Sequence, residues 1–485
     1  MPIASRRYKA PVENGAVLAE PPLGDVPALV AANRTVLAKF GAFRVAARQE
    51  VLVLARQYTV AGSQSPSIII DGLDFNSPLL LSGHQPELSH PGVWAKNFAL
   101  HGIAQKIGGL SLNLVVDNDT LKTTALKLPT WDSREPRSVR LETVPFDTNR
   151  VEQPYEVRDV EDYALFESFA ERAASHWQHW GYTPMLPEVW RQVLDHPAPT
   201  IGERFAVVRR AKEREWGCHN LELPVSHLSK TVAFQQFVGQ IVRDLPRFTA
   251  IYNDALHQYR SANQIRSKNH PAPDLEPGET PFWRMTGAGR TKFFATEHDI
   301  PELRPRALTL TLFARLFLGD FFIHGIGGGK YDEVTDAIIR DFYGIEPPLF
   351  QVLSATVHLP LPTFPTTVTD VLALRRRERD LHWNPQRHLP KRDTEFTEVQ
   401  SLVNRHHLLE AVAPSAPRDR QERYRNFREI SDQLRPRVEA RLTDTRDWLT
   451  RAEQEATANA ALVRRDFAWV LYPEAMLRPI MQQFL

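Results

Sequence analysis

The residues best suited to chemistry lie between positions 78 and 98, in the sequence SPLLLSGHQPELSHPGVWAKN. The apolar run 79–81 predicts a strand, and a Pro91-Gly92 turn leads into a helical pattern that carries Lys96. The polar loop between them contains two imidazoles, an amide and a carboxylate, from His84, Gln85, Glu87 and His90. In open α/β sheets, ligands bind where such loops leave the carboxyl ends of the strands. The sequence therefore predicts a site here without specifying its chemistry.

A second segment, 320–343, has the same order of strand, polar loop and helix. Its apolar run ends at His324, and Lys330 and Asp332 follow a run of three glycines, Gly327, Gly328 and Gly329. Glycines let a backbone approach a ligand closely, and the N–H groups at a helix start favour an anion. The spacing matches neither the Walker A motif nor the dinucleotide-binding glycine motif. We expect a polar or anionic ligand here, with a plain glycine-rich connector as the alternative.

Two further segments carry candidate side chains. The run 112–116 predicts a buried parallel strand, and Asp117, Asn118 and Asp119 follow it. Carboxylates at that position could hold Mg²⁺ or a substrate amine or hydroxyl, or they could only cap the next helix. The long polar loop 264–283 adds three candidates, Asn269, His270 and Asp274. Long loops in compact domains are often functional, although these side chains could also satisfy one another within a turn.

Composition narrows the function classes. The chain has 485 residues, 42% of them hydrophobic and 24% charged, as is usual for a soluble globular protein. A net charge of +1 gives no electrostatic reason to expect nucleic acid or a membrane as a partner. The single cysteine, Cys218, excludes an intrachain disulfide and a cysteine-based zinc site. The longest apolar stretch, 307–326, is broken by Arg315 and Asp320. We therefore expect a cytoplasmic protein that acts on a small molecule.

The alternation of strand and helix patterns predicts an α/β protein with a mostly parallel sheet. We expect an N-terminal helical segment at 1–60 and a core at 61–372. The core would include a short strand at 68–70, further strands at 138–145 and 348–360, and a helical insertion at about 160–260. Residues 471–485 are expected to return onto the core.

The sequence changes character at 373–470, which is rich in Arg, Glu, Asp, Gln and Ala. Long amphipathic helices on either side of a turn at 413–419 predict an antiparallel coiled-coil hairpin. We expect this arm to protrude and to pair two protomers into a homodimer.

Taken in order, these motifs resemble the family of the cysteine-adding enzyme of bacillithiol synthesis. Its members carry a strand, a loop of the type Gly-Gln-Gln-Pro-Gly and a helix with a lysine, where this chain has Gly83-His84-Gln85-Pro86-Glu87 and Lys96. The family's acidic turn after the next strand is similar to 117–119, and its later glycine-rich unit is similar to 324–332. The order of motifs matches over about 75–485, ending in a helical hairpin and a short return like 467–478.

This resemblance implies a Rossmann-like core, a coiled-coil domain and a cleft for a nucleotide- or sugar-like ligand. His84 and Glu87 stand where the family has glutamine and glycine, and the acidic turn lacks the family's histidine. We therefore expect a divergent relative, to which the cysteine-adding reaction itself does not carry over.

Three function classes remain open. In a ligase or group-transfer enzyme, His84 and His90 would act as acid and base or stabilise negative charge, Asp117 and Asp119 would complete the catalytic set, and Lys96 would bind a phosphate or carboxylate. The cofactor is unspecified, with a nucleotide or Mg²⁺ as candidates. The second class is a metal-dependent hydrolase, since imidazoles and carboxylates bind zinc or manganese. The third is a non-catalytic ligand-binding scaffold that dimerises through the arm.

Overall fold

The computed structural model describes residues 7–61, 74–287, 289–295, 302–413 and 416–485. The expected strand at 68–70 and residues 414–415 of the expected turn at 413–419 lie outside these described residues. The chain forms two compact units. Unit 1 comprises 1–128, 143–360 and 465–485, and unit 2 comprises 129–142 and 361–464.

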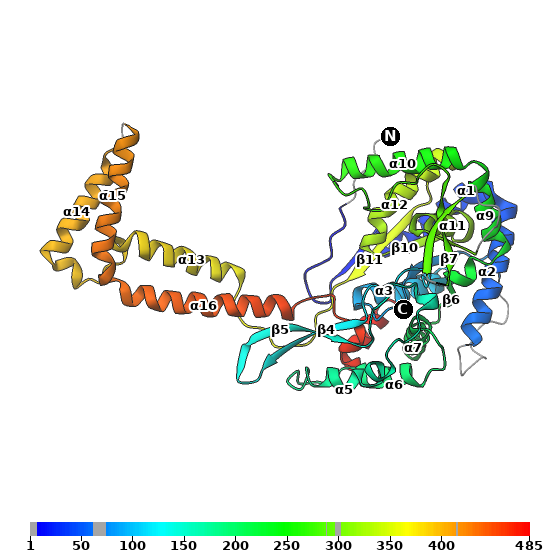
Figure 1. Cartoon of the computed structure of the whole chain (residues 1–485), viewed down its shortest axis with the longest axis horizontal. Coiled ribbons are helices and arrows are strands. Elements are labelled where there is room, and N and C mark those ends of the chain that lie inside the picture. Colours follow the sequence, from blue (N-terminus) through cyan, green and yellow to red (C-terminus); the bar gives the residue numbers. More distant parts are fainter. Residues whose placement is uncertain (1–6, 62–73, 288, 296–301, 414–415) are drawn as a thin grey trace. The chain divides into compact units, whose positions relative to one another are not determined.

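A six-stranded sheet lies at the centre of unit 1, in the order β1-β11-β10-β2-β3-β6 (Figure 1). Five strands are parallel, and β1 pairs with β11 in the antiparallel sense at one edge. The strands are β1 (Val17–Glu20), β2 (Leu79–His84), β3 (Leu110–Val115), β6 (Leu221–Pro224), β10 (Phe321–His324) and β11 (Phe350–Ala355). The predicted α/β class with a mostly parallel sheet is confirmed.

The inner strands are apolar because both faces of the sheet are covered. Leu79, Leu80 and Leu81 of β2 have no exposed surface. Successive side chains point to opposite faces, and Leu79 and Leu81 belong to one large core cluster with α2 (Gly41–Ala61). On the other face, α3 (Pro91–Lys106) packs against β2, β3 and β11. This sandwiching explains why the sequence of β2 reads as a continuous apolar run.

The path of the chain through the sheet reverses at β2. From β2 the chain proceeds outward to β3 and then β6, and it later returns to the other side of β2 to form β10 and β11. Leu81 of β2 lies opposite Phe322 of β10 in parallel register. The loops that follow β2 and β10 therefore leave the same edge of the sheet from neighbouring strands.

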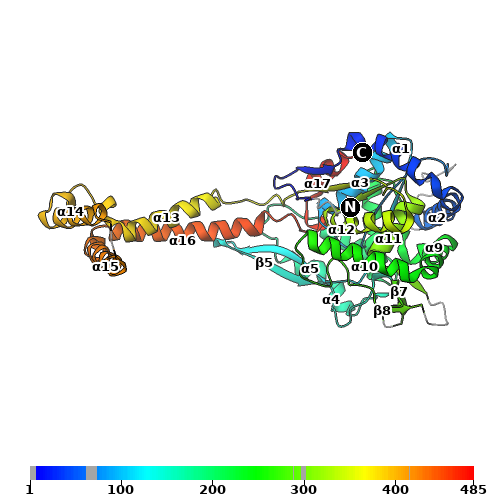
Figure 2. The same ribbon diagram turned by 90° about the horizontal axis from the view of Figure 1, so that it is seen from above.

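Helices cover both faces of this sheet, and α17 lies beside α3 (Figure 2). The remaining helices of unit 1 are α1 (Val26–Leu37), α4 (Tyr163–Glu167), α5 (Phe169–Ala174), α6 (Leu186–Asp195), α7 (Ile201–Glu215), α8 (Val225–Leu228), α9 (Val232–Arg243), α10 (Leu245–Ala262), α11 (Ala307–Phe313), α12 (Ile326–Ile338) and α17 (Glu474–Gln482). No helix among the described residues is long and apolar enough to cross a membrane.

Two strands lie where the sequence indicates something else. Residues 161–259 read as mainly helical, yet β6 lies within them and pairs with β3. The Pro-rich first 24 residues contain β1, which pairs with β11. Unit 1 also holds a three-stranded sheet of β7 (Glu279–Thr286), β8 (Gly289–Phe294) and β9 (Leu303–Pro305). A hairpin of β4 (Ala125–Asp132) and β5 (Glu135–Pro145) is divided between the two units.

Unit 2 consists mainly of four helices in two pairs: α13 (Val368–Trp383), α14 (Thr397–Ala411), α15 (Pro417–Leu434) and α16 (Glu439–Leu462). α13 packs against α16, and α14 packs against α15. Each pair has its own small apolar cluster, around Leu381 and Leu442 in the first and around Val399 and Ile430 in the second. The second pair turns away from the direction of the first (Figure 1). The first interruption, at 384–396, separates α13 from α14, and the second, at 435–438, separates α15 from α16.

Candidate functional site

The loop after β2 is held in place by the start of α3. His90 caps this helix, because its Nδ1 accepts a hydrogen bond from the amide of Gly92 at 3.1 Å. Pro91 occupies the first helical position, where its missing N–H costs nothing. A side chain on Gly92 would collide with the carbonyl oxygen of Ala355 at the end of β11. Glycine at this position therefore allows α3 to start close against the carboxyl edge of the sheet.

Lys96 places a buried positive charge between the ends of β2 and β10. Its side chain is almost fully buried, and its Nζ donates a hydrogen bond to the carbonyl oxygen of Gly83 at 3.1 Å. Its Cε lies 3.9 Å from where a Cβ on Gly325, just after β10, would stand. Burial lowers the pKa of Lys96 to about 8, and the charge of Glu87 only partly opposes this shift. Lys96 is therefore a cation at neutral pH that can lose its proton at mildly alkaline pH.

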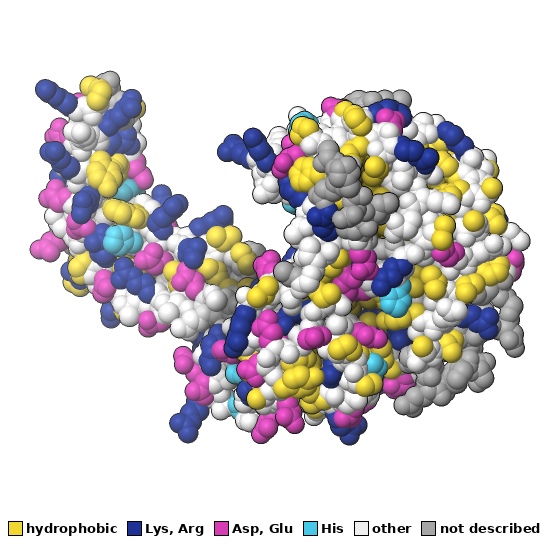
Figure 3. Space-filling view, turned by 45° about the vertical axis from the view of Figure 1, so that its right-hand side comes forward, with side chains coloured by type: hydrophobic (Ala, Val, Ile, Leu, Met, Phe, Trp, Pro, Cys, Tyr) yellow, Lys and Arg dark blue, Asp and Glu magenta, His cyan; other side chains and the backbone are white. Residues whose placement is uncertain are grey.

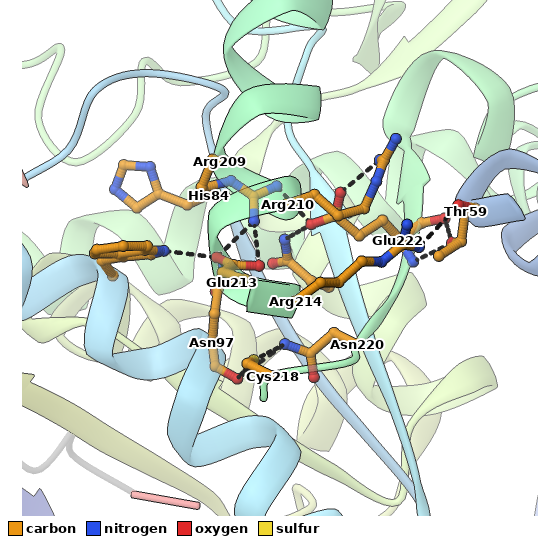
Figure 4. A network of polar contacts seen from close by, with 12 residues as sticks. Thr59, His84, Asn97, Arg209, Arg210, Glu213, Arg214, Cys218, Asn220 and Glu222 are labelled. Atoms are coloured by element: carbon orange, nitrogen blue, oxygen red, sulfur yellow. Dashed lines mark hydrogen bonds and ion pairs between the residues drawn. The ribbon is translucent and has the colours of Figure 1, made fainter. Parts of the chain in front are cut away.

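His84 offers a free imidazole nitrogen at the end of β2. Its Nδ1 lies 3.2 Å from the carbonyl oxygen of Gln85, a contact that requires the proton on Nδ1. Burial, together with the charge of Lys96, lowers the pKa of His84 to about 3, so the ring is neutral at physiological pH. The ring lies apart from the dashed network in Figure 4. Its Nε2 lone pair has no hydrogen-bond partner among the described residues.

His90 lies in the same positive surroundings. Burial lowers its pKa to about 4, and the nearby charges of Arg465 and Lys96 act in the same direction. Arg465 is anchored by a 2.6 Å hydrogen bond to Ser354 of β11. The carboxyl ends of three neighbouring strands, β11, β10 and β2, thus meet two neutral histidines and two cations.

The loops after β2 and β3 are linked through Asp119. Gln85 donates to Asp119 Oδ2 at 2.8 Å, and Arg290 of β8 donates to Oδ1 at 2.9 Å. Burial alone would raise the pKa of Asp119, but these hydrogen bonds and the charge of Arg290 hold it below its ordinary value. Both carboxylate oxygens are occupied, so Asp119 positions the loops and is poorly placed to bind a ligand directly.

Glu87 is the carboxylate nearest to His84, with its Oε1 3.7 Å from His84 Nδ1. Burial raises its pKa, and the negative charge of Asp119 adds to the rise. The sequence places Glu87 among the polar groups of the predicted site loop but outside the predicted catalytic set. The structure shows that it lies closer to His84 than any carboxylate of the predicted catalytic set.

Asp117 and Asn118 point elsewhere. Asp117 accepts hydrogen bonds from both the amide and the hydroxyl of Ser226, which follows β6. Burial raises the pKa of Asp117 to about 7, while the hydrogen bonds from Ser226 oppose the rise. Asn118 donates to the carbonyl oxygen of Pro305 on β9. These two side chains connect strands and do not join His84 and Lys96.

The second predicted loop divides into an open part and a buried part. Gly327 and Gly328 are exposed at the start of α12, where the first helical N–H groups have no partner within the helix. His324 and Asp332, in contrast, bond to each other at 2.8 Å and are buried. Asp332 also bonds to the buried Arg315 at 2.5 Å. His324 is therefore turned into the core and does not accompany His84.

Two other residues of this loop have distinct roles. Gly329 is buried where a Cβ would collide with Val352 of β11, so it allows α12 to pack closely on the sheet. Lys330, on the same turn, is half-exposed.

The three candidate residues of the loop 264–283 contact other parts of the chain. Asp274 bonds to Arg260 at 2.6 Å and to His257 at 3.0 Å. The ring of His270 packs against Tyr331 of α12 with 5.3 Å between ring centres. Asn269 is exposed, and its amide bonds to the hydroxyl of Ser267. None of these contacts brings the three residues to the β2 loop.

A buried polar network fixes the helix that carries Lys96 (Figure 4). Glu213 of α7 accepts hydrogen bonds from Trp94 and Asn97 of α3, each at 2.7 Å. Arg209 bridges Glu213 at 2.8 Å and Glu222 of β6 at 2.5 Å.

Arg210 pairs with the second oxygen of Glu222 at 2.8 Å. Two carboxylates thus face two guanidinium groups, and the network clamps α3, α7 and β6 together. This clamp holds α3 in the position from which Lys96 reaches the strand ends.

The described residues contain no group of three or more His, Cys, Asp or Glu side chains that could hold a metal ion. The histidines and carboxylates of the predicted catalytic set are separated by their partners: Asp117 faces Ser226, and Asp119 faces Gln85 and Arg290. No observation in this part of the chain favours a metal-dependent hydrolase.

Two arginines of this region, Arg290 and Arg465, were not predicted from the sequence as site residues. Arg290 comes from a short hairpin 171 residues after Asp119. Arg465 follows the long helical region, 111 residues after Ser354. No local motif surrounds either arginine, so only the folded chain reveals their roles.

We compared the sequence with models of protein families and with curated proteins, and neither comparison gave a match. What the site does is therefore argued from its own geometry.

Proposed function

We propose that unit 1 has a Rossmann-like core. Numbered along the chain, its parallel strands stand in the spatial order 3-2-1-4-5, with β2 as strand 1 and β10 as strand 4. This is the order of Rossmann folds, in which ligands bind at the carboxyl edge where the strand order reverses. Here the reversal falls between β2 and β10, beside Lys96.

We further propose that this edge is the active site of a ligase or group-transfer enzyme. Its substrate would be a small polar, sugar- or nucleotide-like molecule, as the resemblance to the cysteine-adding family of bacillithiol synthesis suggests. The observation that carries the proposal is the buried ammonium group of Lys96 at the reversal point. A buried charge is expensive unless it is paired, so its retention at this position favours a role in binding an anionic ligand.

The roles follow from the chemistry of each group. Lys96 and the N–H groups at the start of α12 would bind a phosphate or carboxylate of the substrate. The neutral His84, whose pKa of about 3 makes it a weak base, would accept a hydrogen bond through Nε2 from an attacking amine or hydroxyl and orient it. Glu87, whose Oε1 lies 3.7 Å from the other ring nitrogen, would favour this orientation of the ring through its charge. Asp119 and Arg290 would keep Gln85, and with it the loop, in position.

The proposal includes a homodimer that pairs through unit 2. Several large hydrophobic side chains of this unit are exposed among its charged residues (Figure 3). They include Val368, Leu408, Val412 and Tyr424, at 71%, 68%, 67% and 58% exposure. Unit 1 also carries exposed apolar side chains, such as Val12 at 85%, so the proposed interface requires those of unit 2 to form one contiguous patch, which is typical of a protein interface.

A ligand screen by thermal unfolding tests the site. Nucleotides, sugar phosphates and amino acids would be added singly to wild type, Lys96→Met and Lys106→Met. Lys106 is the matched control, because it lies on the same helix and is exposed. A ligand at about 100 times its Kd stabilises by roughly 2.7 kcal/mol. We expect a ligand that shifts wild type and Lys106→Met but does not shift Lys96→Met.

The catalytic role of His84 requires a second readout. In His84→Ala, we expect turnover to fall by about 10²–10³, while the melting temperature and the ligand-induced shift stay near those of wild type. If no compound separates Lys96→Met from Lys106→Met, the strand edge is not a binding site. If a ligand binds without any turnover, the non-catalytic scaffold replaces the enzyme.

A further inference from the structure

A small cavity lies at the opposite, amino-terminal edge of the same sheet. It has a volume of ≈ 160 Å³ and lies between α1, α2 and the strand starts. Asp320, directly before β10, lines it and binds the first amide of β2, that of Leu79, at 2.9 Å. Because β2 has six residues, its two ends are about 15–20 Å apart. This cavity is therefore distinct from the edge that carries Lys96.

Arginine side chains dominate the polar lining of this cavity. The lining residues of greatest interest are Arg34, Arg44, Arg48, Phe75 and Asp320. Arg44 donates to Asp320 Oδ1 at 2.7 Å, and Arg48 donates to Oδ2 at 3.2 Å. Both guanidinium groups are buried, whereas Arg34 stands exposed. Three positive charges thus share one buried carboxylate.

Among the described residues, a second carboxylate acts on this cluster, that of Asp74, whose charge interacts with Arg34 and Arg48. Asp74 is fully open to solvent, so water screens its charge, and its own hydrogen bonds go to Asn76 and Ser77. Even with Asp74 counted in full, three guanidinium groups face two carboxylates. At least one positive charge of the cluster has no counterpart among the described residues.

Arg44 also donates to the carbonyl oxygens of Leu316 and Gly319, and Arg48 donates to that of Ser77, so part of their lost hydration is replaced. Two buried guanidinium groups beside one buried carboxylate still leave a net positive charge, which is costly at a buried position.

The pKa of Arg44 reflects this cost: it is lowered to about 10, mainly by burial and in addition by the charges of Arg48 and Arg34, against the pull of Asp320. The Nε of Arg48 is also buried without a hydrogen-bond partner. An anion in the cavity would supply both the missing charge and a missing acceptor.

We propose that this cavity binds a small oxyanion, a phosphate or carboxylate group of a free metabolite. Guanidinium groups match the geometry of both groups and bind them through paired N–H donors. Since a water molecule in the liquid takes up about 30 Å³, the cavity has room for roughly five, enough for one such group. Leu37 and Phe75 line its apolar side, which suits a ligand with a short apolar part.

The proposed anion would also tie helices to strands. Arg34 is on α1, Arg44 and Arg48 are on α2, and Asp320 fixes the starts of β2 and β10. A bound oxyanion that joins these arginines would stabilise the assembled unit. The inference does not depend on the proposed enzyme activity, because it concerns other residues at the other edge.

Titration with inorganic phosphate tests the proposal. The melting temperature of the full-length protein would be measured against phosphate, with sodium chloride keeping the ionic strength constant. All proteins would carry Lys96→Met, so that the opposite edge does not contribute. The variants are Arg34→Ala, Arg48→Lys and the matched control Arg56→Ala, since Arg56 lies on α2 but does not line the cavity.

We expect a saturable rise in melting temperature with phosphate. Arg34→Ala should raise the apparent Kd for phosphate at least tenfold, and Arg48→Lys should raise it as well. Arg56→Ala should leave the apparent Kd within twofold of the value for the parent protein. A parallel titration with acetate distinguishes the two chemistries, because an equal or stronger response assigns the site to carboxylates. The proposal is overturned if phosphate acts no better than chloride, or if Arg34→Ala and Arg56→Ala respond alike.

Discussion

Replacing Glu222 with glutamine should destabilise unit 1 far more than its size suggests. Its side chain is fully buried and accepts hydrogen bonds from Arg209 at 2.5 Å, Arg210 at 2.8 Å and Asn113 at 2.9 Å. Glutamine has nearly the same shape, but it removes the charge and turns an N–H donor toward guanidinium donors. Two charge-assisted hydrogen bonds contribute about 1.5–3 kcal/mol each, and breaking a buried ion pair costs about 3–5 kcal/mol. We therefore expect a loss of about 3–5 kcal/mol at pH 7.

Glu276→Gln is the matched control. Glu276 pairs with Lys292 at 2.5 Å, the same distance as Glu222 to Arg209, but its side chain is 61% exposed. Exposed pairs contribute about 0–1 kcal/mol, so this variant should unfold nearly as wild type does. Urea denaturation followed by tryptophan fluorescence measures both, because Trp94 bonds directly to the network. Equal losses in the two variants would refute the claim that burial sets the size of the effect.

The pH dependence gives the same prediction an independent check. Burial would raise the pKa of Glu222, but Arg209 and Arg210 outweigh it and hold the pKa below the ordinary value of 4.5. A carboxylate with a lowered folded pKa stabilises the fold above its unfolded pKa, and this contribution disappears as the pH falls through the folded value. The difference in the free energy of unfolding between wild type and Glu222→Gln should therefore be constant from pH 7 to 5 and become smaller below about pH 4.5.

Three further predictions concern packing, charge and assembly. Gly329→Ala should lower the free energy of unfolding by about 1–3 kcal/mol, because the new Cβ meets Val352. Gly327 has open space around it, so Gly327→Ala should be neutral or raise the free energy of unfolding by up to about 1 kcal/mol. Urea denaturation of the two variants tests this difference. Lys96→Met should melt above wild type at pH 7, because its pKa of about 8 lies below the ordinary 10.5 and the buried cation opposes folding. The stability of wild type should rise as the pH increases from 8 toward 10.5, so that the difference in melting temperature between the two proteins disappears. A difference in melting temperature that does not change with pH would contradict this explanation. Leu408→Glu should convert a dimer to a monomer in sedimentation, and an unchanged mass would exclude that part of unit 2 as the interface.

Local patterns allowed the β2 region to be predicted well. The apolar run 79–81, the polar loop and the helix with Lys96 follow one another within 20 residues, so periodicity and turn residues are enough to place them. The same is true of β10 and the glycine-rich start of α12. That the two loops share an edge follows from the rule that parallel strands of an open sheet place their carboxyl ends together.

Features that depend on distant contacts could not be predicted. β6 has only four residues, and its strand conformation comes from pairing with β3 rather than from its own pattern. His324 has the sequence surroundings of a ligand-binding residue, yet Asp332 and the buried Arg315 turn it inward. The sequence contains no sign that Arg315, on the preceding helix, would neutralise Asp332. Tertiary charge pairing thus decided which of the predicted site residues lie together.

The position of β10 beside β2 has a consequence for the synthesis of the chain. Ser82 and Ile323, which bond to each other across these strands, are 241 residues apart. At about 5–20 residues per second, the ribosome needs roughly 12–50 s to reach the second strand after making the first. For that time the apolar strand 79–84 has an open edge in the nascent chain, and unpaired strand edges promote association with other chains. Expression yield should therefore depend on chaperones that act while the chain is still growing.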